Sequence, residues 1–200
     1  SYYHDFGELE FMAEGLRGPV ILSASAVITK LVNAEDPEKW KLLTVHINLK
    51  PALDEEELDR RLLRDFEACR NKELRNAFGA LLPAQLIPIF NARLEARGVD
   101  IHRKVTEVDR ETRKKAVALM RDFSYTIRGT GSFKEAIVTQ GGVSVKELNP
   151  KTMEARKIKG LYFAGEVLDV DGYTGGFNMQ MAFSTGHLAG KAAAEETLTD

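Results

Sequence analysis

The sequence contains one cysteine, no long apolar run and little net charge, and each of these absences excludes a class of protein. Cys69 alone cannot form an internal disulfide or a cysteine-based metal cluster, which fits a reducing, cytoplasmic compartment. No apolar run approaches the ~18 residues of a membrane span, and no signal-peptide pattern opens the chain, so we expect no membrane partner. The net charge of −2 gives no reason to expect nucleic acid as a partner.

Motifs for metal binding and for nucleotide phosphates are missing as well. The four histidines, at positions 4, 46, 102 and 187, show no HExxH or paired spacing, so we expect no metal site. Glu166, Asp169 and Asp171 lie close together, but the glycine and distal glutamate of a calcium loop do not follow in register. No strand is followed by GxGxxG, so a complete dinucleotide-binding unit is not present in these residues.

The composition is that of an ordinary globular chain of 200 residues, 44% hydrophobic and 29% charged. The pattern of expected elements changes after residue 123, from strands mixed with a group of helices to strands followed by one helix. Before it, hydrophobic patterns predict strands at 8–13, 20–23 and 40–48, and helices at 23–32, 54–69, 74–82, 83–96 and 106–120. After it they predict strands at 124–128, 135–139, 143–145 and 161–164, and a long helix from Phe177 to Ala194. The predicted fold class is therefore α+β, with a domain boundary near residues 123–131.

Most functional information lies in residues 159–190, where a strand, a glycine-rich loop and a helix follow one another. Gly175 and Gly176 let the backbone approach a ligand, and Asn178 carries an amide. The first turn of a helix carries partial positive charge, which would stabilise the N1–C2=O edge of a reduced flavin. The alternative interpretation is a glycine-rich connection that packs tightly against a sheet.

Three stretches together strongly resemble the C-terminal part of the BaiN/YhiN-type flavoproteins. They are VTQGGV at 138–143, NPKTME at 149–154 and GLYFAGEVLDVDGYTGGFNMQMAFSTGHLAG at 160–190. The first half also fits, because DFGELEFMAEGLRGPVIL is similar to the family segment GELLFTHFGLSGPAIL, and NLKP at 48–51 and GALLP at 79–83 follow in the expected order. The resemblance covers nearly the whole chain.

The resemblance implies a bacterial FAD-dependent, NAD(P)-linked oxidoreductase of the class with two dinucleotide-binding domains. Residues 1–127 would be an insert domain with a small β-barrel-like part and a helical part. Residues 128–200 would be the C-terminal strands and helix of a Rossmann-type FAD-binding domain.

The resemblance also implies the cofactor-binding residues, whereas no catalytic residue is identified. Gly165 and Glu166 would lie by the ribityl chain of FAD, with Glu166 accepting a hydroxyl. The isoalloxazine ring would face the residues at the start of the helix, which are Gly176, Phe177, Asn178 and Met179, next to Gly175. The same cavity would also be lined by Thr139, Gly141 and Gly142.

The whole protein implied by this family would pass hydride between NAD(P)H, flavin and a small unsaturated or carbonyl substrate. Because the GxGxxG half is missing, and the chain starts SYYHDFGELE without Met, we expect a fragment that is inactive alone and binds little FAD. The alternative is a non-catalytic module for binding or oligomerisation. Exposed strand edges in such a fragment would favour a homodimer.

Overall fold

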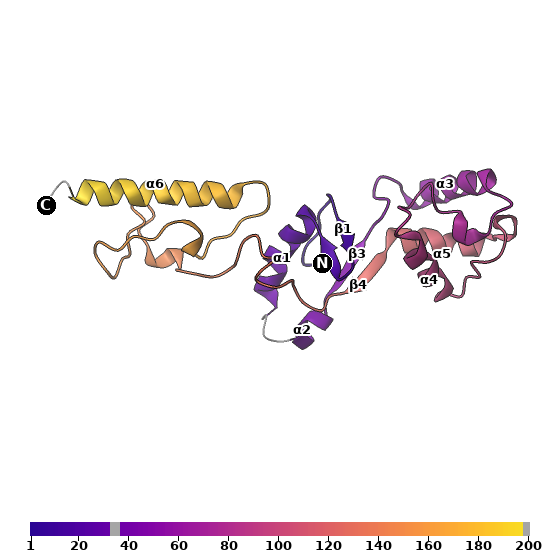
Figure 1. Cartoon of the computed structure of the whole chain (residues 1–200), viewed down its shortest axis with the longest axis horizontal. Coiled ribbons are helices and arrows are strands. Elements are labelled where there is room, and N and C mark those ends of the chain that lie inside the picture. The colour runs from indigo at the N-terminus through magenta and orange to yellow at the C-terminus, as the bar shows by residue number, and fades with distance from the viewer. Residues whose placement is uncertain (33–36, 198–200) are drawn as a thin grey trace. The chain divides into compact units, whose positions relative to one another are not determined.

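The computed structural model describes residues 1–32 and 37–197, and these form two compact units (Figure 1). One unit joins residues 1–40 to residues 128–200, and the other comprises residues 41–127. The described chain contains helices and two separate two-stranded antiparallel sheets, which confirms the α+β class. The assignment of residues 1–127 to an insert domain stays a prediction.

The first unit begins with a short hairpin and a helix. β1 (Glu10–Met12) pairs with β2 (Gly15–Arg17), and α1 (Pro19–Leu31) follows directly. The strand predicted at 20–23 is wrong, because Pro19 occupies the first helical position, where its fixed φ favours a helix. The amide of Leu22 donates to the Gly18 carbonyl at 3.0 Å, which closes the first turn.

The second unit is built on a two-stranded ribbon and three helices. A short helix, α2 (Pro37–Lys41), lies at the boundary between the two units, and after it β3 (Thr44–Ile47) pairs antiparallel with β4 (Phe123–Thr126). Between these strands the chain forms the three helices of the unit, which Figure 1 shows grouped together. They are α3 (Glu55–Ala68), α4 (Ile87–Glu95) and α5 (Arg110–Arg121).

The helix starts in this unit follow local chemistry. Asp54 caps α3 in a reciprocal capping box: its carboxylate accepts from the Glu57 amide at 2.8 Å, and the Glu57 carboxylate accepts from the Asp54 amide at 3.1 Å. The expected start of α5 at residue 106 is three residues too early, because the capping carboxylate is that of Asp109, which accepts from Thr112. That hydrogen bond lowers the pKa of Asp109.

The helix predicted at 74–82 is also wrong, because only a 3-10 turn (Leu74–Asn76) forms there. The chain instead pairs with a distant segment, since the amide of Leu74 donates to the Arg103 carbonyl and that of Arg75 to the Ile101 carbonyl, both at 3.0 Å. Such long-range pairing leaves no local periodic signal in the sequence.

Aromatic rings join the elements of the second unit into one core. The rings of Phe66 and Phe78 lie 6.0 Å apart, those of Phe78 and Phe90 4.9 Å, and those of Phe90 and Phe123 6.3 Å. The first two pairs meet edge to face and the third is stacked, and aromatic contacts of both kinds add to the stability gained from apolar burial. The core is completed by fully buried aliphatic side chains of the helices: Leu58, Leu62, Leu94, Leu119 and Met120.

The chain from residue 128 to residue 176 contains none of the predicted strands. Instead of strands at 135–139, 143–145 and 161–164, the structure has single bridges, of which Val143 with Leu168 is parallel and Glu154 with Tyr162 antiparallel. The 3-10 turns of this segment are Val145–Glu147 and Gly165–Val167. A strand needs a hydrogen-bonded neighbour along its length, and the described residues supply one for only a residue at a time.

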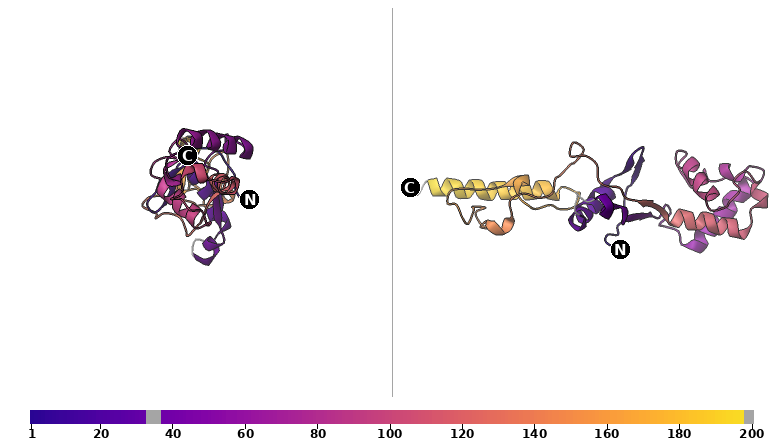
Figure 2. Two further views of the ribbon diagram at one scale, coloured as in Figure 1. Left: turned by 90° about the vertical axis from the view of Figure 1, so that its right-hand side faces the viewer. Right: turned by 90° about the horizontal axis from the view of Figure 1, so that it is seen from below.

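One long helix, α6 (Phe177–Thr197), closes the chain, and Figure 2 shows it straight and unbroken. Its Ala189 packs into a small core with Leu148, Met153 and Leu168, which anchors the preceding segment along the helix. No helix among residues 1–32 and 37–197 combines the length and the apolar character that crossing a membrane requires.

Candidate functional site

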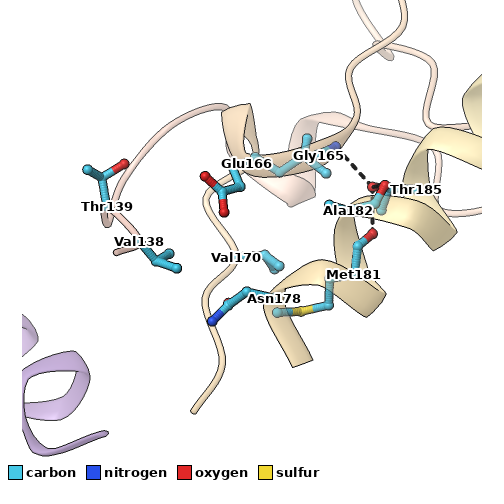
Figure 3. Close-up of a pocket in the computed structure, with 10 residues that line it drawn as sticks. Val138, Thr139, Gly165, Glu166, Val170, Asn178, Met181, Ala182 and Thr185 are labelled. Carbon is cyan, nitrogen blue, oxygen red and sulfur yellow. Dashed lines mark hydrogen bonds between the residues drawn. The ribbon is translucent and has the colours of Figure 1, made fainter. Parts of the chain in front are cut away.

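The predicted ligand loop lies between a 3-10 turn and α6 and is fixed to both. Gly165 begins the turn at φ +77°, and its amide donates to Thr185 Oγ1 of α6 at 3.0 Å. The Thr185 hydroxyl in turn bonds to the Met181 carbonyl at 2.7 Å (Figure 3). The hydroxyl therefore couples the position of the turn to the second turn of the helix.

The side chain of Asn178 binds the backbone of the same loop at Gly172. The Gly172 amide donates to Asn178 Oδ1 at 2.8 Å, and Asn178 Nδ2 donates to the Gly172 carbonyl at 3.1 Å. The side-chain amide is thus engaged with the backbone in both directions. In this arrangement Asn178 orders the loop that precedes its own helix.

The two glycines before α6 differ in what surrounds them. Gly175 has φ +111°, and a Cβ there would contact the Phe177 ring at 3.6 Å. Gly176 has φ +90°, and a Cβ there would meet no heavy atom within 4 Å among the described residues. The backbone at Gly176 is therefore open to a neighbouring molecule at the point where the first-turn amides of α6 carry partial positive charge.

A small hollow lies beside this turn and is lined by residues from three segments (Figure 3). It brings together Thr139, Gly165, Glu166 and Asn178, four of the residues expected from the sequence. The other expected residues are not in its lining: Gly141, Gly142, Gly175, Gly176, Phe177 and Met179. Phe177 and Met179 are 61% and 62% exposed, so both side chains offer free apolar surface.

Sequence reasoning missed six residues that line the same hollow. These are Val138, Leu168, Val170, Met181, Ala182 and Thr185. A signal for the helical members existed, because Asn178, Met181, Ala182 and Thr185 are spaced three and four apart and so share one face of a helix. Met181 and Ala182 add apolar side chains to the lining, and Asn178 and Thr185 add polar ones.

Gly142 has a packing role within the site. It has φ +132°, and a Cβ there would collide with the Val167 carbonyl oxygen. The next amide, of Val143, donates to that same carbonyl at 2.8 Å, and the Asp169 amide donates to the Val143 carbonyl at 2.9 Å. A glycine is therefore required for the segment containing Thr139 to lie against the segment that follows Gly165.

Polar contacts hold the acidic part of the loop to α1. Asp171 accepts from Lys30 Nζ at 3.0 Å and from Gln140 Nε2 at 2.9 Å, and Gln140 Nε2 also donates to the Ala26 carbonyl at 2.7 Å. Asp171 is therefore engaged in structure. Across the described parts of the chain, no cluster of three or more histidine, cysteine or acidic side chains that could hold a metal ion is formed.

The segment leading into Gly165 is tied to the far end of α6 by a titratable pair. The Tyr162 hydroxyl donates to Glu196 Oε2 at 2.7 Å, and Lys159 Nζ lies 3.1 Å from Glu196 Oε1. The hydrogen bond to Glu196 raises the pKa of Tyr162 to about 12, and the same bond, with Lys159, lowers the pKa of Glu196.

Comparison with known proteins gives one family match. Residues 23–192 match the family described as the HI0933-like protein Rossmann domain, which covers most of the chain and includes the hollow and α6.

Three characterised relatives are similar over most of this chain. The 3-dehydro-bile acid delta(4,6)-reductase of Clostridium scindens is 30% identical over 191 residues, which are 96% of this chain and 45% of that protein. The ribosomal RNA dihydrouridine synthase of Escherichia coli is 34% identical over 177 residues, 88% of this chain and 40% of that protein. The synthase of the same name from Haemophilus influenzae is 30% identical over 183 residues, 91% of this chain and 41% of that protein. The chain thus spans less than half the length of these relatives.

Proposed function

Because this chain belongs to the family of HI0933-like proteins with a Rossmann domain, we propose that it forms the flavin-ring side of an FAD-dependent oxidoreductase. The observation that carries the proposal is the junction at Gly176, where open backbone at φ +90° leads directly into the first turn of α6. A planar ring with a negative edge fits this junction, since a Cβ added at Gly176 would meet no heavy atom of the described residues within 4 Å and the helix end is electropositive.

The names of the relatives indicate the reaction class. One is named as a reductase of a dehydro-bile acid and two as synthases of dihydrouridine, so each name describes the reduction of a carbon–carbon double bond. In both the oxo-steroid and the uracil ring, a carbonyl conjugated with the double bond accepts the electrons of an added hydride. We therefore propose that the whole protein adds hydride to a conjugated, carbonyl-activated double bond, with NAD(P)H as the electron source.

FAD, when bound, supplies the ring nitrogen through which hydride passes from the nicotinamide to the substrate. The residues of this chain would hold one face and one edge of that ring. The backbone of Gly176 and the first-turn amides of α6 would lie at the N1–C2=O edge, and the exposed Phe177 and Met179 would offer apolar contact. Glu166, beside Gly165 in the lining of the hollow, would accept a hydrogen bond from a ribityl hydroxyl.

The phosphate half of the site is not among these 200 residues, because the sequence has no GxGxxG turn after a strand. We therefore propose that the chain alone retains little FAD. The anchoring groups for the pyrophosphate and the adenosine would come from a nucleotide-binding half.

Complementation tests this proposal. The chain is mixed with the separately expressed nucleotide-binding half of the E. coli relative and with FAD, and flavin that co-elutes in gel filtration is measured by absorbance. We expect flavin uptake and NAD(P)H oxidation with both halves and little uptake by the chain alone. Flavin retained by the chain alone in near-stoichiometric amount, or no uptake by the mixture, would contradict the proposal.

A matched pair of glycine variants locates the flavin edge. Gly176→Ala places a Cβ on the open backbone, and Gly160→Ala is its control, because Gly160 also has positive φ (+77°) and an added Cβ there would meet no heavy atom within 4 Å. Both substitutions carry a similar backbone strain of about 1 kcal/mol. Loss of flavin uptake in Gly176→Ala alone supports contact between this backbone and the ring, and equal loss in both variants argues against it.

A further inference from the structure

The loop that leads into Gly176 is anchored to the N-terminal segment of the chain. The resemblance implies an insert domain for that segment, whereas in this structure residues 1–40 form one compact unit with residues 128–200. Three of the four residues at 171–174 have a contact in the N-terminal segment, and the fourth, Gly172, is bonded to the side chain of the second residue of α6. A continuous set of contacts therefore joins the N-terminal segment to the start of α6.

The first anchor is the carboxylate of Asp171, whose side chain is only 9% exposed. Lys30 Nζ lies 3.0 Å from its Oδ1, and Gln140 Nε2 donates to its Oδ2 at 2.9 Å. A carboxylate buried to this extent keeps the cost of its desolvation when its cation is removed, although water screens part of the attraction because Lys30 is 58% exposed. The position of Asp171 therefore depends on Lys30.

The second anchor lies three residues later, at Thr174. Its Oγ1 is 3.3 Å from the Oγ of Ser23, which is a buried residue of α1. A buried hydroxyl that loses its partner costs free energy, so this contact fixes both side chains. The rings of Tyr3 and Tyr173 meet as well, with their centroids 6.4 Å apart and their planes tilted at 56°.

Both anchors lie on one face of α1. Ser23 and Lys30 are seven residues apart, which is nearly two turns and about 10.5 Å along the helix axis. The stretch from Asp171 to Thr174 runs antiparallel to α1, because Asp171 meets the end of the helix and Thr174 its beginning. Three extended residues span about 10 to 11 Å, so the stretch has little slack between its anchors. The backbone that continues into Gly176 therefore starts from a fixed point.

We propose that Ser23, Lys30 and Asp171 are positioning residues of the flavin site, which hold the loop before α6 in the place that the ring requires; this role rests on the function proposed above. The backbone of Gly176 and the first-turn amides of α6 have no side-chain freedom with which to follow a ligand. A displacement of 1 Å in such a site costs about a hundredfold in rate. The anchoring reaches this backbone directly, because Gly172 follows Asp171 and is bonded to α6.

Hydrogen exchange of the chain alone tests the anchoring and needs no flavin. The probes are the amides of Gly172 and Gln180, which are both hydrogen-bonded, on either side of the open backbone. Lys30→Met removes the ammonium group but keeps a long side chain, and should speed their exchange about tenfold, whereas Lys30→Arg should restore most of the protection. Lys191→Met is the control, because that ammonium pairs within α6. Unchanged exchange in Lys30→Met overturns the proposal.

A second pair of variants tests the other anchor with a smaller change. Ser23→Ala removes the hydroxyl that meets Thr174, and should speed exchange at the same two amides about fivefold. Ser25→Ala is the matched control, because the Ser25 hydroxyl donates to the Leu22 carbonyl within α1, and its effect should stay below about twofold. Equal effects of the two substitutions overturn the role of Ser23. Circular dichroism checks that the helices of each variant stay folded.

The complemented mixture then tests whether the anchoring serves the flavin. With the nucleotide-binding half of the E. coli relative and FAD, Lys30→Met should weaken FAD binding about tenfold and shift the visible absorption bands of the flavin, and Lys30→Arg should restore both. Faster exchange with unchanged FAD binding and an unchanged spectrum overturns the positioning role, because the contact would then stabilise only the fold. No flavin uptake by the unsubstituted mixture contradicts the proposed reductase instead, and the exchange rates of Lys30→Met then decide the anchoring by themselves.

Discussion

Asn178 and Gly172 are joined by two hydrogen bonds, one in each direction, at 2.8 and 3.1 Å. The side chain of the second residue of α6 therefore fixes the backbone six residues earlier. The loop between them contains Gly175 and Gly176, so the open backbone next to the helix end is held by a contact within the same short segment.

Replacing Asn178 should release this loop. In Asn178→Ala the Gly172 amide and carbonyl lose their partners, which costs about 1–3 kcal/mol of local stability. We expect faster hydrogen exchange at the amides of 172–176 with little change in α3. Gln180→Ala is the control, because the Gln180 side chain contacts Ser184 on the same helix, and unchanged exchange in Asn178→Ala would show that the loop is held by other contacts.

Thr185→Val should open the turn at Gly165. Valine has nearly the same shape but cannot accept from the Gly165 amide, which leaves a partly buried donor unpaired at a cost of about 1–3 kcal/mol. The expected result is a lower urea midpoint and faster exchange at residues 165–167. Ser184→Ala removes an exposed hydroxyl from the adjacent position, and an equal loss of stability there would refute the importance of the Thr185 contact.

Gly142→Ala should disrupt the pairing of Val143 with the segment after Gly165. The added Cβ collides with the Val167 carbonyl in a backbone conformation that alanine disfavours, so we expect a loss of about 2–4 kcal/mol. Gly141→Ala shares the positive φ (+97°) but meets no heavy atom within 4 Å. Chemical denaturation gives the free energy of unfolding of each variant, and the difference between the two measures the cost of the collision alone. Equal values would show that the segment relaxes freely around the added Cβ.

The pair Tyr162 and Glu196 should make stability depend on pH at both extremes. The lowered pKa of Glu196 adds stability above the pKa of an unfolded glutamate, which is lost as the pH falls through the folded value. The raised pKa of Tyr162 adds stability below its ordinary value of 10.0, which is lost as the pH rises towards about 12.

Titration of labelled tyrosine rings by NMR checks this pair. One ring should ionise near pH 12, should disappear in Tyr162→Phe and should titrate lower in Glu196→Gln. Glu195→Gln, which removes a neighbouring carboxylate of α6, is the control. A Tyr162 ring that titrates at its ordinary pH in the unsubstituted protein would show that the hydrogen bond is not kept in solution.

The sequence by itself determined the features that depend on neighbouring residues. The apolar spacing and Asp54 predicted α3, and the glycines and polar residues around position 176 predicted the start of α6, because helix capping and backbone freedom are local properties. The stretches at 138–143, 149–154 and 160–190 also identified the flavoprotein family, which the family match confirms. Four residues of the expected site, including Glu166 and Asn178, do line one hollow.

Only the tertiary structure decided which local preferences are satisfied. Residues 161–164 have the composition of a strand, but a strand requires a partner, and the described chain gives Tyr162 a single bridge to Glu154. The amide of Asn178 suits a ligand equally well, yet in this fold it binds Gly172. Gly142 is required by the carbonyl of a residue 25 positions later, and the arginines of α3 line a hollow with Leu53 from the preceding loop. These outcomes depend on residues that meet only after the chain has folded, so no local pattern in the sequence contains them.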